Sequence, residues 1–98
     1  MPTQLLVMTP NTIYDLQTAF DTALVEDVRY QIQAKGTGTI YLKDATATPT
    51  DMNGFGWHTI STNPTETAND QAVIRFKSGE SVYAWSKDQN WLVCSEDV

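Results

Sequence analysis

The chain is short of cysteine, histidine, basic residues and long apolar runs. Among its 98 residues the single cysteine is Cys94, so neither an intrachain disulfide nor a zinc site built from several cysteines can form. Six Lys and Arg stand against twelve Asp and Glu, which gives a net charge of -6. Because nucleic-acid binding depends on basic contacts to phosphates, this balance argues against nucleic acid as a partner.

The N-terminal region lacks the features of a secretory signal or a membrane anchor. It has no basic segment, and its apolar run, Leu5 to Met8, covers four residues. A secretory signal needs a longer apolar stretch, and a membrane span needs about 20 residues. We therefore expect a protein made in the cytoplasm, with no membrane partner, in which Cys94 is a small packed side chain.

The composition of the chain and the spacing of its turn residues indicate a single all-β domain over residues 1–98. Apolar residues make up 41% of the chain and aromatic residues 10%, which is enough for one core. Threonine, which favours strands, occurs at 14 positions. Clusters of Pro, Gly, Asn and Asp interrupt the chain about every ten residues, a spacing typical of a sandwich or barrel. The predicted fold is an antiparallel β-sandwich, jelly-roll-like, of about eight short strands.

Alternation of apolar and polar side chains marks the strands. It is strict from Asp27 to Lys35, which places one set of side chains in the core and the other in water. A strand at Thr39–Lys43 follows after a loop with two glycines, so the two are expected to pair as a hairpin. Further strands are expected at 56–61, 71–77, 81–86 and 90–95, the last two paired around the turn at 87–89, with surface connections at 44–55 and 62–70.

Residues 12–24 fit two patterns. Four apolar residues lie at helical spacing, and Thr12 with Asp15 resembles a capping box; the four are Ile13, Leu16, Phe20 and Leu24. Alternation also fits a strand, and the all-β, threonine-rich surroundings favour extended structure here. If assembly uses an N-terminal arm or a strand pair, we expect residues 1–25 to form it.

No grouping of residues points to catalysis, a cofactor or a metal. The single histidine, His58, has no acid or metal ligand beside it, so a strand residue is expected rather than a base. The stretch with Asp44, Asp51 and Asn53 lacks the ligand density and closing glutamate of a calcium loop, and we expect a solvated turn. Nucleophile elbows, P-loops and dinucleotide fingerprints do not occur. We predict that the chain is not an enzyme.

Two predicted strands carry apolar side chains on both faces. In the first, Tyr83 and Trp85 point away from Val82 and Ala84, and residues 91–94 repeat the arrangement. A strand that is apolar on both faces needs cover on both faces. Either another segment of this chain supplies that cover, or a second subunit or partner does. For the second alternative the expected interface residues are Tyr83, Trp85, Trp57 and Trp91.

Three stretches, Val28–Asp44, Ala45–His58 and Ser78–Ser86, together resemble a group of small β-sandwich virion proteins of tailed bacteriophages. Members of that group often serve as capsid decoration (cement) proteins. The resemblance covers residues 26–95. It implies a homo-oligomer, a trimer by preference, that is made in the host cytoplasm, binds the major capsid protein on the outside of the shell and has no catalytic residue.

A second hypothesis belongs to another functional class. The chain would be a carbohydrate- or receptor-binding module of a phage head or tail fibre. Trp57, Trp85 or Trp91 would then stack on sugar rings, while Asp and Asn side chains bind the hydroxyl groups. Binding to cells but not to capsids would favour this alternative.

Overall fold

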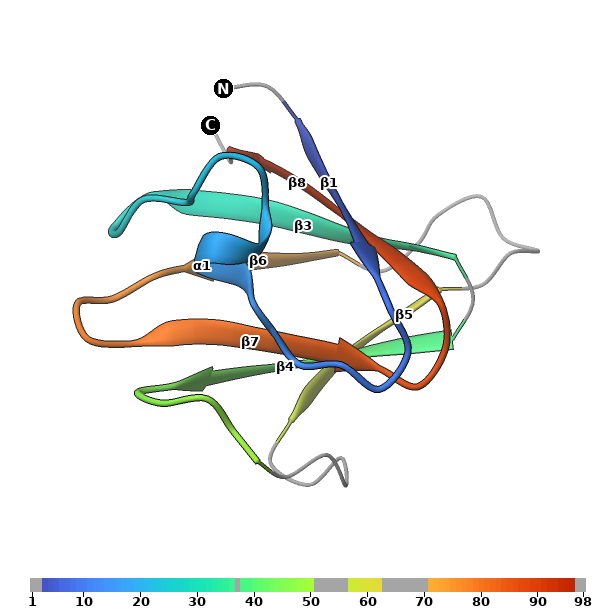
Figure 1. Cartoon of the computed structure of the whole chain (residues 1–98). Helices are drawn as coiled ribbons and strands as arrows, with labels where there is room; N and C mark the ends of the chain where they lie inside the picture. The colour runs from blue at the N-terminus through green and yellow to red at the C-terminus, as the bar shows by residue number, and fades with distance from the viewer. Residues whose placement is uncertain (1–2, 37, 51–56, 63–70, 97–98) are drawn as a thin grey trace.

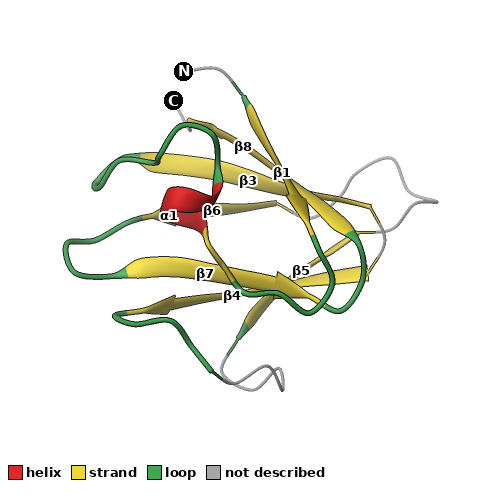
Figure 2. Cartoon of the chain, viewed as in Figure 1, coloured by secondary structure: helices red, strands yellow, loops and turns green. Residues whose placement is uncertain are grey.

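The computed structural model describes residues 3–36, 38–50, 57–62 and 71–96. The described residues form strands joined by short connections, with one helical turn (Figures 1 and 2). In chain order the elements are β1 (Gln4–Met8), β2 (Tyr14–Asp15), α1 (Leu16–Ala19), β3 (Arg29–Gly36), β4 (Gly38–Ala45), β5 (His58–Thr62), β6 (Gln71–Arg75), β7 (Ser81–Ser86) and β8 (Asn90–Glu96).

The strands form two antiparallel sheets of four strands each. Sheet A has the order β1-β8-β3-β6, and sheet B has the order β2-β7-β4-β5. Every connection passes from one sheet to the other except the one between β4 and β5, which are neighbours in sheet B. This order is that of a jelly roll, so the predicted all-β sandwich of eight strands is confirmed.

Both expected hairpins are wrong. β3 pairs with β8 and β6 in sheet A, whereas β4 pairs with β7 and β5 in sheet B. The expected pair of β7 and β8 is likewise divided between the two sheets. Alternation determines which side chains face the core but not which strand lies alongside. A short link can also carry the chain across the roughly 10 Å between stacked sheets.

The segment after β1 combines the two patterns that the sequence allows. Tyr14 and Asp15 are extended and pair with β7. The backbone then turns into α1, and Asp15 caps it by accepting a hydrogen bond from the Gln17 N–H at 3.0 Å. Extended structure is therefore wrong for α1, where one helical turn places Leu16 in the core. Leu16, like the later Phe20 and Leu24, is buried in the core.

The core lies between the inner faces of the two sheets. Each long strand contributes alternate residues to it, as the pattern predicts. Cys94 is among them with 1% of its surface exposed, so its expected packing is confirmed. The main inward residues are Leu6 and Met8 of β1, Tyr30, Ile32 and Ala34 of β3, Ile40 and Leu42 of β4, Ile60 of β5, Ile74 of β6, Val82 and Ala84 of β7, and Leu92 of β8.

The two long connections expected from the sequence fall largely outside the described residues, at 51–56 and 63–70. Among the residues that are described, no helix has the length and apolar character needed to cross a membrane.

Candidate functional site

Three of the four predicted interface aromatics form a second cluster on the outer face of sheet B. Trp57, Tyr83 and Trp85, here called the aromatic cluster, are 8%, 6% and 1% exposed. The Trp85 ring stacks on Tyr41 with 4.5 Å between centroids, and Trp57 meets Trp85 edge-on at 6.1 Å. The Lys43 ammonium lies 5.6 Å from the centre of the Trp57 ring.

The chain itself supplies the cover that the aromatic cluster needs. Ile13, Tyr41 and Ala45 pack against the cluster. Of the two alternatives that the sequence leaves open for this face, cover by another part of the same chain is the arrangement that the structure adopts. Trp57, Tyr83 and Trp85 therefore offer almost no accessible area to a partner.

Trp91, the fourth predicted residue, lies in the exposed apolar region on the outer face of sheet A. Its ring is 37% exposed, and Val7 opposite it on β1 is 54% exposed. One pair further along, Leu5 is 58% exposed and faces Val93. We call these four side chains the apolar patch. Apolar area gathered in this way on a small protein is typical of a contact surface.

Sequence analysis missed Leu5 and Val7. The available signal was the run Leu5–Met8, whose members are apolar on both faces of a strand. By its length alone, that run argues only against a secretory signal and a membrane span. Because Leu6 and Met8 point into the core, Leu5 and Val7 must point away from it.

The face that carries the apolar patch also carries cationic side chains, one next to the patch and two farther along the sheet. Lys35 on β3 is directly opposite Trp91, and Arg29 on β3 is opposite Arg75 on β6. The other outward positions described on β3, β6 and β8 hold glutamine, valine and serine, with no carboxylate among them. A chain with a net charge of -6 thus has one face that is apolar and positively charged. We call this whole face the contact face.

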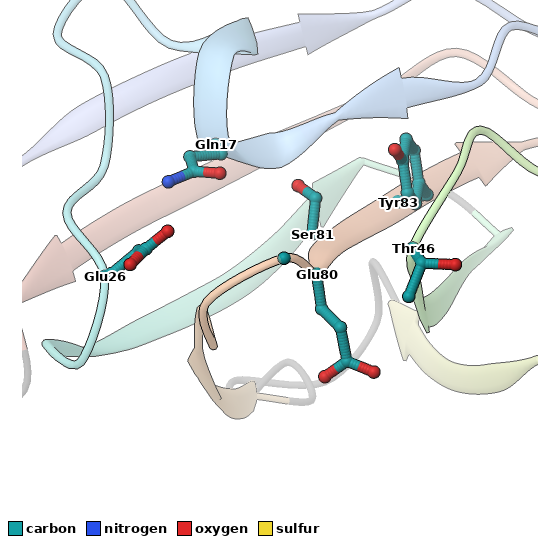
Figure 3. A pocket seen from close by; sticks show the side chains of 7 residues that line it. Gln17, Glu26, Thr46, Glu80, Ser81 and Tyr83 are labelled. Carbon is teal, nitrogen blue, oxygen red and sulfur yellow. The ribbon is translucent and has the colours of Figure 1, made fainter.

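A shallow hollow near one end of the sandwich contains polar side chains but no reactive grouping (Figure 3). It has a volume of about 240 Å³, and Glu26 and Glu80 reach it from different segments. The Ser81 hydroxyl donates a hydrogen bond to the Asp15 carboxylate, which also caps α1. That hydroxyl is therefore held in a local structural bond rather than directed at a substrate.

His58 lies at a different place, at the start of β5. It is exposed and lines a second hollow of about 220 Å³ whose walls are mainly apolar, including Leu42, Ile74 and Val82. Asp44 also lines this hollow, whereas the other residues of the candidate calcium loop lie outside the described part. Among the described residues no three His, Cys, Asp or Glu side chains are grouped so as to hold a metal ion.

Cys94 has the environment of a structural thiol. It is free and buried, and burial raises the pKa of the thiol from 9.0 to about 11. Because the thiolate is the nucleophilic form, the protonated and enclosed side chain is unreactive at neutral pH.

A buried polar group near the β7–β8 turn was also missed by the sequence analysis. The Ser86 hydroxyl donates to the Thr39 carbonyl at 2.8 Å and accepts from the Asn90 side-chain amide at 2.8 Å. Ser86 and Asn90 are both 0% exposed. The group joins β4, β7 and β8 at the point where the chain passes between the sheets, which indicates a structural role.

In comparisons with known proteins, no protein-family model, curated protein or solved structure gives a significant match to the chain.

Proposed function

We propose that the chain is a structural virion protein of a tailed phage. It binds the outside of the capsid shell and stabilises the shell as a decoration protein, with the major capsid protein as its partner. It works as a homo-oligomer, a trimer by preference, and catalyses no reaction. Its place of action is the capsid surface, after synthesis in the host cytoplasm.

The contact face is the observation that carries this proposal. Leu5, Val7 and Trp91 expose apolar area on the outer face of sheet A, in a sandwich whose other indole rings are buried. Apolar side chains gathered on the outer face of a sheet suit contact with another protein better than they suit enclosing a small substrate, which needs a concave site. The resemblance of residues 26–95 to phage virion proteins supports a capsid as the partner.

The mechanism follows from the size of the exposed area. The apolar patch comprises four side chains, which is fewer than a stable two-protein interface of standard size uses. Reinforcement of a shell does not need strong single contacts, because an oligomer that binds several neighbouring capsid subunits multiplies weak ones. The acidic remainder of the surface keeps the free protein soluble at high copy number.

The direct test is the copy number of the chain on purified particles of the phage that encodes it. Quantitative mass spectrometry should find the chain in a fixed, high ratio to the major capsid protein. Particles assembled with Trp91→Ser should carry fewer copies, whereas Lys87→Glu in the β7–β8 turn should leave the ratio unchanged. Particles that lack the chain, or carry only a few copies, would overturn the proposal.

A carbohydrate- or receptor-binding module remains the second candidate, and it now depends on Trp91. Among the three tryptophans, only Trp91 exposes a substantial part of its ring, with Lys35 opposite it. Sugar stacking needs such a ring with polar groups around it. A glycan array probed with the purified chain distinguishes the two functions, since binding that is lost in Trp91→Ser would favour this one.

A further inference from the structure

Residues 21–27 form an exposed loop whose charge is opposite in sign to that of the contact face. Asp21, Glu26 and Asp27 are exposed on it, and Val25 among them is 55% exposed. Leu24 is buried and anchors the loop in the core. We call residues 21–27 the acidic loop. It presents an apolar side chain among carboxylates, whereas the contact face presents apolar side chains beside Lys and Arg.

The acidic loop is held in one conformation by hydrogen bonds to four other parts of the chain. A loop that is already ordered loses little conformational entropy when it docks. The bonds are Thr22 N–H to the Gln4 side-chain oxygen at 2.8 Å, the Gln4 side-chain amide to the Thr22 carbonyl at 3.1 Å, Leu24 N–H to the Gln17 carbonyl at 2.9 Å, Val25 N–H to the Tyr30 hydroxyl at 2.9 Å, and Asp27 N–H to the Phe76 carbonyl at 2.9 Å.

We propose that the acidic loop of one copy of this chain docks on the contact face of another copy. Val25 packs on the apolar patch, and the loop carboxylates lie opposite Lys35, the cation next to Trp91 of the patch. This rests on the homo-oligomer named under the proposed function and deepens it by assigning the two surfaces that meet. The contact face joins the copies, and the oligomer binds the capsid through its remaining surfaces.

Charge complementarity is the reason to choose a second copy in this orientation. The outward positions described on the strands of the contact face include three cations and no carboxylate, so two contact faces placed against each other would bring like charges together. The chain as a whole is acidic, and its acidic loop carries three exposed carboxylates and one exposed apolar residue, Val25. The loop therefore offers the contact face the negative charge that it lacks and an apolar side chain that can pack on its apolar patch.

The small area predicts a weak and salt-sensitive contact. With four patch residues and one loop valine at its centre, we expect a dissociation constant in the micromolar to millimolar range. Exposed charges are screened over about 10 Å at 0.1 M salt and about 3 Å at 1 M, so association should weaken as salt is added.

Sedimentation equilibrium of the purified full chain tests the contact. The wild type should associate reversibly at concentrations up to roughly 1 mM, and less so in 1 M salt. The face variant Lys35→Glu and the loop variant Glu26→Lys should each weaken association at least about tenfold. The variant that combines both changes restores opposite charges and the wild-type net charge, and it should associate like the wild type.

Matched controls carry the same kinds of charge change at positions that belong to neither the contact face nor the acidic loop. Lys87→Glu and Asp88→Lys lie in the exposed β7–β8 turn and should leave association unchanged. Two results with the wild type alone overturn the proposal: a protein that stays monomeric at every concentration, or an association that does not weaken as salt is added. Loss of association in both single-surface variants with no recovery in the combined variant, although thermal melting shows it folded, also overturns it. Particle-bound chains that do not self-associate would leave capsid binding standing, whereas self-association without particle binding would overturn only the capsid function.

Discussion

At the scale of single residues, the buried side chains that the sequence did not assign are polar. Ser86 and Asn90 occupy inward positions on β7 and β8 and are fully enclosed. The alternating pattern of β7 and β8 assigns both residues to the inner face. Serine and asparagine are polar, however, so the sequence fits equally well with side chains exposed to water at the strand ends. The structure resolves the choice because the Asn90 amide donates to the Ser86 hydroxyl, which in turn donates to the Thr39 carbonyl.

Replacing Ser86 with alanine should lower the free energy of unfolding by about 2–3 kcal/mol. The change leaves the Thr39 carbonyl and the Asn90 amide without the hydroxyl that now joins them in the core. Urea denaturation measures the loss. Ser78→Ala, at an exposed position, is the matched control and should change stability by less than about 0.5 kcal/mol. Equal losses in the two variants would refute the structural role of the Ser86 group.

Cys94 makes stability depend on alkaline pH. Its folded-state pKa is raised to about 11 by burial, so the folded state keeps its proton at pH values where the unfolded chain has lost it. The stability difference between wild type and Cys94→Ala is therefore constant below pH 9. As the pH rises from 9 to 11, the free energy of unfolding of the wild type should fall by up to about 3 kcal/mol relative to that of Cys94→Ala.

Urea denaturation of both proteins between pH 7 and 11 measures this difference. The alanine variant is the control for every other group that titrates in the same range. A difference that stays flat over the whole range would show that the thiol is not held protonated by the fold.

At the scale of elements, the sequence predicts which face of each strand is buried but not which strands pair. Ala72, Ile74 and Phe76 face inward, as their alternation predicts. The pairing is determined by contacts between segments distant in sequence, such as β1 with β8, which no local pattern encodes. This is why two links between consecutive strands, each expected to close a hairpin, instead carry the chain between sheets.

The division of the tryptophans between cluster and surface gives an element-level prediction. Trp57→Ala should lower the free energy of unfolding by about 3–5 kcal/mol, because Trp57 is packed edge-on against Trp85. Trp91→Ala removes a side chain that is 37% exposed to water, so its cost should be below about 1.5 kcal/mol. Urea denaturation of the two variants makes the comparison, and a larger loss for Trp91 would contradict the assignment.

At the scale of the whole molecule, the distribution of charge and apolar surface could be predicted only in part. The net charge of -6 is visible in the sequence, and Trp91 was identified from its strand pattern. The gathering of Lys35, Arg75 and the apolar patch on one side depends on the order β1-β8-β3-β6, because that order brings strands from both ends of the chain together. A jelly roll thus converts scattered residues into one face, and the sequence does not reveal the face before the strand order is known.

The most direct test of the contact face is hydroxyl-radical footprinting of the tryptophans in dilute and in concentrated solution. Trp57 and Trp85 are buried in the monomer and serve as internal references, with low oxidation in both conditions. The account predicts that Trp91 is oxidised readily in dilute protein and is protected when copies associate. Trp91 oxidation that stays the same while the protein associates would contradict it.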